Sequence, residues 1–390
     1  MTGTAGPRDT VLVAAARTPV GRFNGALRGV DARSLGASAV AAAMDRLGQP
    51  VVPDRILLAN IVQAGNGQNP ARAAAVRAGL PTTVPGTTLI ELCPASVTCV
   101  PLCRLMIGAG EAQAVLVGGF ESMSRALHGI QVRQAARLGP PEVLDLLTND
   151  GLWCAISDEG MGELSDDANA ALGIGRAEQD EWALESHRRA AAAQAAGAFA
   201  AEIVPLPQLD ADEGVRPDSS AEALARLRPA FHPDGTITAG NASQLSDAGA
   251  AGLVTSREYA ARLGVAPLAE VLDVAMVAGP DPTLHLKPAD AARRLLERNG
   301  LTVGDIGVWE VNEAFAGVVI ATMRDLDLDP ERVNLHGGAI AIGHPLAASG
   351  FRIVMSAVTT MTRGGSELGI ATMCGGGGQG AAVLLRLPRG

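Results

Sequence analysis

Strand-like and helix-like segments alternate along the chain, and this alternation occurs twice within its 390 residues. In the first part, the apolar runs TVLVAAA (10–16) and RILLANIV (55–62) predict buried strands on either side of the helix-like stretch SLGASAVAAAMDRLG (34–48). The same order returns later, where AEVLDVAMVAG (269–279) predicts a strand and DAARRLLERNG (290–300) predicts a helix. Because βαβ order favours a parallel sheet covered by helices on both faces, we predict an α/β protein made of two similar halves.

The middle of the chain, residues 121–247, departs from this alternation and is richer in charge and proline. We therefore predict that a loop domain is inserted into the first half. Within the second half, VNLHGG (333–338) is expected to form a short strand. The predicted units are an N-terminal half of residues 1–118 and 248–268, an inserted loop domain of residues 119–247 and a C-terminal half of residues 269–390.

The net charge of −10 argues against a nucleic-acid-binding protein, which requires a basic face. It does not argue against an anionic small ligand, because a few local arginines suffice to bind one. The longest uncharged run, residues 368–385, contains four successive glycines and is a poor membrane span, so no membrane association is expected. The first ten residues have neither an apolar core nor an arginine-rich helix, and we expect no targeting segment there.

The chain contains five cysteines: Cys93, Cys99, Cys103, Cys154 and Cys374. Their number is odd and their spacing matches no metal motif, so neither a disulfide framework nor a metal site is expected. A chain of this length needs no disulfides for stability, and free thiols favour a reducing, cytoplasmic location. Cys99 and Cys103 fall on the helix predicted after Cys93 and are expected to pack in the core.

Two polar residues follow directly on predicted strands. Cys93 follows TTLIEL (87–92), and Asn312 follows DIGVWEV (305–311). Parallel α/β sheets bind ligands at the carboxyl ends of their strands. A thiol at a strand-to-helix turn also faces backbone N–H groups and the positive end of a helix dipole, which lower its pKa. Taken singly, Cys93 is more often a buried packing residue, and Asn312 is equally well a helix cap.

Two further stretches contain chemically active residues among glycines. His344 lies between Gly343 and Pro345, and Cys374 ends a predicted strand directly before four glycines. Four glycines lose much backbone entropy on folding. We therefore expect them where backbone N–H groups face an oxyanion or where a thin ligand lies against the backbone. Two cysteines, a histidine and an asparagine at one edge of a sheet favour covalent thiol chemistry, because cysteine is a strong nucleophile near neutral pH.

These residues and their surroundings resemble the thiolase family over nearly the whole chain. The resemblance implies a thiolase-like fold: two similar βαβαβαββ halves with five-stranded sheets, packed in five αβαβα layers, and an inserted loop domain. It rests on RTPVGRFNGAL (17–27), GQNPARAAAVRAGLP (67–81), VLVGGFESMS (115–124), DGLWCAISDEGMG (150–162), LARLRPAFHPDGTITAGNAS (224–243), SQLSDAGAAGLV (243–254), NEAFA (312–316), HGGAIAIGHPLAASG (336–350) and CGGGGQGAAVLL (374–385).

The resemblance assigns a role to each candidate residue. Cys93 is the nucleophile that carries the acyl group, and His344 activates it and points its ring at the thioester oxygen. Asn312 holds a water that completes this first oxyanion hole, and Cys374 is the acid/base thiol of the second half-reaction. The remaining assignments are the backbone N–H groups of Cys93 and Gly376 as a second oxyanion hole and Ser243, Met161 and Phe315 as substrate-binding residues, with Ser243 beside the pantetheine arm.

The activity that the resemblance implies is acetyl-CoA C-acetyltransferase, which joins two acetyl-CoA to acetoacetyl-CoA or reverses that reaction. No cofactor is permanently bound, and acyl-CoA and coenzyme A are the partners, with a homodimer or homotetramer expected. The alternatives are a longer-chain 3-ketoacyl-CoA thiolase of fatty-acid breakdown, a pathway-specific condensing enzyme, and a non-catalytic acyl-CoA-binding scaffold. The related β-ketoacyl synthases lack a second catalytic cysteine before a glycine run, so Cys374 and NEAFA argue against them.

The sequence departs from the family pattern at several positions near the site. Ala95 and Ser96 follow the nucleophile in place of the usual Ser-Gly, Ala347 replaces a glycine, and Cys154 stands where the family often has aspartate. Glu159 and Gly160 replace the Tyr-His of the acyl pocket, so Gly160 is expected either to open room for a larger acyl group or to be neutral. Arg216, Arg226 and Arg228 are candidates to meet the phosphates of coenzyme A, and His128, His187, His232 and His285 are expected at the surface.

Overall fold

The structure, a computed structural model, describes residues 9–133, 138–139 and 141–388. Most of the N-terminal segment on which the targeting expectation rests lies outside these residues. Within the described part of the chain, no helix is long and apolar enough to cross a membrane. In the same residues, no three histidine, cysteine, aspartate or glutamate side chains gather where they could hold a metal ion.

Strands from both halves form one continuous mixed sheet. The halves join where β1 pairs with β11, through Val11 opposite Glu270 and Leu12 opposite Ala269. The strands lie in the order β12 (Val308–Val311), β13 (Leu368–Gly375), β14 (Gln379–Arg386), β11 (Ala269–Ala278), β1 (Thr10–Arg17), β10 (Ser246–Ser256), β5 (Ala114–Ser122), β3 (Arg55–Ala59) and β4 (Gly86–Leu89), with β2 (Gly21–Arg22) beside β10. The β3–β4, β3–β5 and β12–β13 pairs are parallel, and the other pairs are antiparallel.

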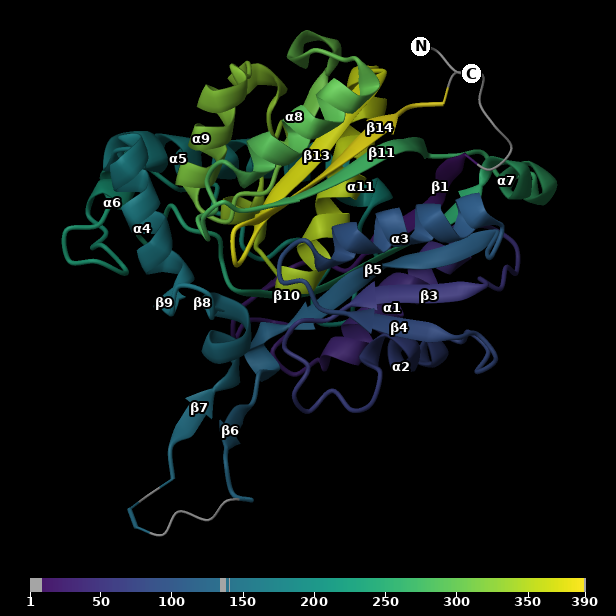
Figure 1. The fold of residues 1–390 in the computed structure, drawn as a ribbon, viewed down its shortest axis with the longest axis horizontal. Coiled ribbons are helices and arrows are strands. Elements are labelled where there is room, and N and C mark those ends of the chain that lie inside the picture. Colours follow the sequence, from purple (N-terminus) through teal and green to yellow (C-terminus); the bar gives the residue numbers. More distant parts are fainter. Residues whose placement is uncertain (1–8, 134–137, 140, 389–390) are drawn as a thin grey trace.

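The helices and the two parts of this sheet stack in five layers, in the order α, β, α, β, α, which confirms the predicted fold class (Figure 1). The outer layers are α1 (Ala32–Asp45) with α2 (Pro70–Arg77) on the N-terminal half, and α8 (Lys287–Asn299) with α9 (Ala316–Leu326) on the C-terminal half. Between the two parts of the sheet lie α3 (Ala95–Ala109) and α11 (Leu346–Gly364), which pack against each other. The short helices α7 (Arg257–Leu263) and α10 (Ala339–Ile342) complete the two halves.

The C-terminal half differs from the expectation at residues 333–338, which form no strand. Only an isolated parallel bridge joins Val333 to Trp309, so this half contributes four strands rather than five. The reason is Asn334, whose side-chain amide takes the place of a strand: its Oδ1 accepts from the Val311 N–H at 2.7 Å, and its Nδ2 donates to the Val311 carbonyl at 2.8 Å. With φ of +48°, Asn334 then turns the chain away from the edge of the sheet.

Between β5 and β10 the chain leaves the sheet and forms mostly helices and short hairpins. The strands β6 (His128–Ile130) and β7 (Val143–Asp145) form a hairpin that projects away from the body of the molecule (Figure 1). The other elements are η1 (Met123–Arg125), η2 (Thr148–Leu152), β8 (Trp153–Cys154), β9 (Glu159–Gly160), α4 (Met161–Leu172), α5 (Arg176–Ala195), η3 (Ala198–Ala201) and α6 (Ala221–Ala225), and the C-terminal half adds η4 (Val303–Asp305) and η5 (Pro330–Arg332).

The central helix α11 is buried along most of its length, because sheet strands pack on it from both halves. Its first turn lies directly on β5, where a Cβ atom at Gly119 would overlap the carbonyl oxygen of Ala347. Only glycine permits this approach of helix backbone to strand backbone. The contact therefore determines where α11 begins relative to the sheet.

Gly118, the neighbouring residue in β5, offers a direct test of this close packing. Its φ is +145°, and a Cβ atom there would overlap the Ala250 carbonyl oxygen and lie 2.8 Å from the Ala251 Cα atom of the paired strand. We predict that Gly118→Ala lowers the free energy of unfolding by about 3 kcal/mol, measured by chemical denaturation. Gly29→Ala is the matched control, because nothing lies within 4 Å of a Cβ atom there. Equal stability of the two variants would contradict the prediction.

Candidate active site

The backbone around Cys93 turns sharply between a strand and a helix. β4 ends at Leu89, three residues earlier than the apolar run suggested, and α3 begins at Ala95. Leu92 has φ of +53°, a conformation in which an L-residue other than glycine, asparagine or aspartate is rarely found. This turn places Cys93 just before the first turn of a central helix, with its side chain partly exposed to a cavity.

Cys93 and His344 meet although 251 residues separate them. The Nε2 atom of His344 lies 3.3 Å from the Cys93 sulfur, and its Nδ1 atom lies 2.6 Å from the Ser349 hydroxyl oxygen. The Ser349 hydroxyl donates to the Pro345 carbonyl at 3.3 Å, so it accepts from the imidazole. We infer that Nδ1 carries the proton and that the Nε2 lone pair faces the Cys93 thiol.

Burial keeps both members of this pair uncharged. It raises the pKa of Cys93 to about 11, against the opposing effect of N–H groups from Gly376 and from Cys93 itself. Burial also lowers the pKa of His344 to about 3, with the positive charge of Arg352 acting in the same direction. The backbone N–H groups lower the pKa of Cys93 as expected, but desolvation outweighs them, so the expected net lowering is wrong. The Nε2 atom of His344 is placed to accept the thiol proton.

Cys374 approaches the same place from the C-terminal half. It lies near the end of β13, next to Gly375, where β13 pairs with β14 and Gly376, Gly377 and Gly378 form the turn. Burial raises its pKa, and the neighbouring Cys93 acts in the same direction. Gly377 and Gly378 have φ of +74° and +72°, which explains why this turn contains glycines.

Asn312 is fully buried directly after β12. Its backbone N–H donates to the Thr372 carbonyl at 3.0 Å. Among the described residues, neither its side-chain nitrogen nor its side-chain oxygen has a hydrogen-bond partner. Buried polar atoms without a partner are rare, so this amide is placed to bind a water.

One narrow cavity of about 60 Å³ connects the residues from both halves. Cys93, His344, Cys374 and Gly376 line it, and so do the predicted substrate-binding residues Ser243, Met161 and Phe315. Asn312 is not among the lining residues. The remaining lining residues are mostly apolar: Leu92, Met123, Gly151, Leu152, Leu245, Leu284, Ala314 and Leu346.

Comparison with known proteins agrees with this geometry. Residues 10–258 match the family model "Thiolase, N-terminal domain", and residues 265–387 match "Thiolase, C-terminal domain". The chain belongs to the thiolase family. It is 43% identical over 388 residues to a probable acetyl-CoA acetyltransferase of Mycobacterium tuberculosis. The aligned residues cover 97% of this chain and 99% of that protein.

Other thiolase relatives match over a similar extent. An acetyl-CoA acetyltransferase of Chromobacterium violaceum is 42% identical over 391 residues, covering 97% of this chain and 100% of that protein. One from Escherichia coli is 42% identical over 392 residues, covering 97% and 99%. Family membership over both domains makes the chain an acyltransferase enzyme.

Some expectations about residues of this thiolase are wrong or incomplete. Gly160 does not line the cavity, because it caps α4 and faces the Glu163 carboxylate. His187 and His285 are buried rather than at the surface, with 3% and 1% of their area exposed. Ser349 was missed, although a hydroxyl one helical turn after the GHP sequence could have drawn attention to it. Arg216, Arg226 and Arg228 are exposed, and their contact with phosphates stays a prediction.

The raised pKa of Cys93 predicts how its reactivity depends on pH. Since its pKa is about 11, alkylation by iodoacetamide should accelerate about tenfold per pH unit from about pH 7 to about pH 10. No plateau is expected near the ordinary thiol pKa of about 8.5. Peptide mass spectrometry would follow the rate at Cys93, with fully buried Cys99 as the unreactive internal reference. A plateau below about pH 9 would indicate a thiolate–imidazolium pair and contradict the neutral pair.

Proposed function

We propose that this thiolase is an acetyl-CoA C-acetyltransferase that condenses two acetyl-CoA molecules to acetoacetyl-CoA and catalyses the reverse thiolysis. The observation that carries the proposal is the 3.3 Å contact between Cys93 and His344 on a cavity that Cys374 also lines. The relatives named above are acetyl-CoA acetyltransferases, which supports the same activity. No permanently bound cofactor is required, because the acyl-CoA thioesters are themselves the reactive groups.

In the first half-reaction, Cys93 becomes acetylated. His344 takes the thiol proton at Nε2 as the sulfur attacks the thioester carbonyl, and Ser349 stabilises the Nδ1–H tautomer that makes this possible. The backbone N–H groups of Cys93 and Gly376 serve as donors to the oxyanion. Coenzyme A leaves as the C–S bond breaks and receives the proton from His344, so the acyl-enzyme forms with neutral groups.

In the second half-reaction, Cys374 acts as the base. Its proton passes to His344, and the resulting thiolate removes an α proton from the second acetyl-CoA. Because burial raises the pKa of Cys374, its thiolate is a stronger base than an ordinary one, which suits a weakly acidic carbon. The enolate oxygen receives hydrogen bonds from His344 and from a water on Asn312. The carbanion then attacks acetyl-Cys93, and the departing sulfur recovers the proton from His344.

The size and lining of the cavity support a short acyl group. About 60 Å³ of space is bordered mostly by leucines and methionines. Among the described residues that line it, Ser243 is the only polar side chain apart from the reacting residues. Gly160, the departure that suggested room for a larger acyl chain, does not border this space. We therefore favour acetyl-CoA over the substrates of a longer-chain 3-ketoacyl-CoA thiolase.

Two cysteine variants test the separate roles of Cys93 as the nucleophile and Cys374 as the base. Cys93→Ala should form no acetyl-enzyme with acetyl-CoA, detected by mass spectrometry of the intact protein. Cys374→Ala should still acetylate Cys93 but condense at least about 1000-fold more slowly, because it removes the base for the α proton. Cys103→Ala is the control, since Cys103 is buried in the core away from the cavity. Condensation at the wild-type rate by Cys374→Ala would contradict its role, and a folded wild-type protein without an acetyl adduct would favour the scaffold alternative.

We further propose that the protein is a homo-oligomer, a dimer or tetramer. Strand β4 is an edge of the sheet, and Ile90 just beyond it is 60% exposed. The β6–β7 hairpin carries exposed apolar side chains, of which Val132 is 71% and Leu144 is 42% exposed. An isolated hairpin is marginally stable in water. Contact with other copies would cover the edge of β4 and the apolar side chains of the hairpin, which a single chain leaves exposed.

The hairpin surface gives a test of assembly. We predict that Val132→Glu combined with Leu144→Glu lowers the particle mass measured by light scattering, because it introduces charge into an apolar contact between copies of the chain. Val52→Glu, at a position that is 55% exposed on a distant loop, should leave the mass unchanged. A wild-type protein that is monomeric at micromolar concentration would contradict the proposal.

We also propose domain boundaries and a location for this thiolase. We keep the division at residues 118/119, 247/248 and 268/269, because β5 and β10 flank the region that leaves the sheet and β11 begins the second half. All five cysteines are free, which is compatible with the reducing cytoplasm that we propose as the location.

A further inference from the structure

An apolar hollow bordered by α11 is separate from the active-site cavity. It has a volume of about 360 Å³ and lies between β1, η3 and the second half of α11. This volume falls within the range of about 300–1,000 Å³ that is usual for small-molecule sites. None of its lining residues also lines the cavity around Cys93.

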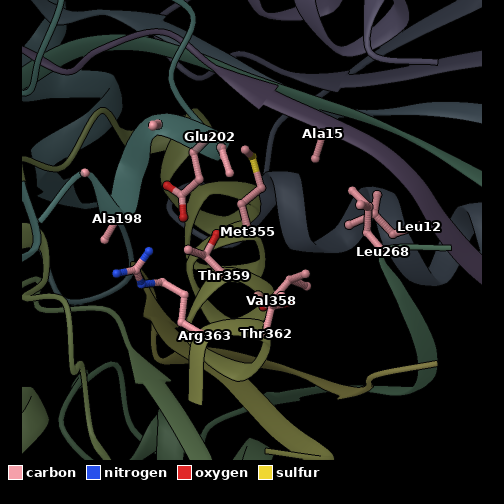
Figure 2. Close-up of a pocket in the computed structure, with 13 residues that line it drawn as sticks. Leu12, Ala15, Ala198, Glu202, Leu268, Met355, Val358, Thr359, Thr362 and Arg363 are labelled. Atoms are coloured by element: carbon pink, nitrogen blue, oxygen red, sulfur yellow. The ribbon is translucent and has the colours of Figure 1, made fainter. Parts of the chain in front are cut away.

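The two ends of this hollow differ in chemistry. Leu12, Leu268 and Val358 form an apolar end, together with Met355 and Ala15 (Figure 2). At the other end, the side chains of Glu202 and Arg363 are directed toward the same space, and Thr359 lies beside them (Figure 2). A ligand that fits would therefore need an apolar body and a charged head.

Glu202 has an unused acceptor in this hollow. Its side chain is 2% exposed, and its Oε2 atom accepts from the Arg17 Nε–H at 2.9 Å. The other nitrogens of that guanidinium bind Asp212 at 2.7 and 2.9 Å. The Oε1 atom of Glu202 is buried and has no hydrogen-bond partner among the described residues. A buried carboxylate oxygen without a donor is costly, so a donor from a ligand is favoured there.

Arg363 supplies the complementary charge. It lies on the last turn of α11 and is exposed, and the described residues include no hydrogen-bond or ion-pair partner of its guanidinium. No ion pair joins it to Glu202 within this part of the chain, although both border the hollow. A head group with one positive and one negative charge would bridge the space between these side chains, with its positive charge on Glu202 and its negative charge on Arg363.

We propose that this hollow binds an α-amino acid with an apolar side chain, its ammonium group on Glu202 Oε1 and its carboxylate on Arg363. The side chain of the amino acid lies among Leu12, Leu268 and Val358. A simple fatty acid would meet Arg363 but leave the Glu202 oxygen without a donor, and a simple amine would leave Arg363 unpaired.

Titration calorimetry on the full chain tests the head-group assignment with four probes. L-leucine carries every feature, 4-methylpentanoate lacks the ammonium, 3-methylbutan-1-amine lacks the carboxylate, and glycine lacks the side chain. We expect L-leucine to bind at least about tenfold more tightly than each of the others, because each lacks one favourable contact. Absence of L-leucine binding at millimolar concentration, or equal binding of 4-methylpentanoate, would overturn the proposal.

Variants locate the binding in this hollow. Arg363→Gln should weaken L-leucine binding about tenfold and leave the affinity for 3-methylbutan-1-amine unchanged, since only the carboxylate contact is lost. Ala201→Phe, at an exposed lining position, should block the hollow and abolish binding. Arg294→Gln, on the exposed surface of α8, is the matched control and should bind L-leucine as the wild type does. Unchanged L-leucine affinity in Arg363→Gln would overturn the assignment, and none of these variants should alter acetyl transfer.

Discussion

The site depends on how closely two helices enter the space between the two parts of the sheet. α3 comes from the N-terminal half and α11 from the C-terminal half, and they pack against each other in the central layer. Cys93 and His344 each lie just before the first turn of one of these helices. The close approach of Ala347 to Gly119 determines where α11 begins, so the 3.3 Å contact between sulfur and imidazole follows from the packing of the core. A catalytic pair formed in this way needs no flexible loop to hold it.

The same burial that positions the pair also determines its chemistry. Desolvation raises the pKa of both Cys93 and Cys374 and lowers that of His344, so the resting site carries little charge. A neutral site admits the apolar acyl group easily, and each charge appears only when a proton moves during reaction. In a medium of low dielectric constant, the Gly376 N–H that we propose as an oxyanion donor would stabilise an oxyanion more strongly than in water.

The sequence predicted the alternation of strands and helices well because that alternation depends on local patterns, and the five layers followed from the resemblance to the thiolase family. From apolar runs, glycines and the chemically active residues, Cys93, His344 and Cys374 are predicted to lie at one edge of the sheet. The sequence-based prediction failed at Asn334, where a side-chain amide takes the hydrogen bonds that a paired strand would take. It also failed for the pKa of Cys93, where burial outweighs the effects expected at a helix start. Neither outcome is visible in a local pattern, since each depends on which distant residues surround the group. The position of Gly160 next to Met161 in sequence likewise does not place it on the cavity, which Met161 lines.

The edge of the sheet would connect the proposed assembly with the active site. Among the described residues, β4 pairs only with β3. It leads within three residues to Leu92, whose backbone is strained, and then to Cys93. Strain of about 1–3 kcal/mol persists only where the surroundings hold the conformation firmly. In one chain, the free edge of β4 leaves one side of this segment without support. Pairing of β4 with a strand of another copy would stiffen the segment directly before the nucleophile. An oligomer of this thiolase would then do more than cover apolar surface, because it would also hold the turn that presents the Cys93 thiol to its base.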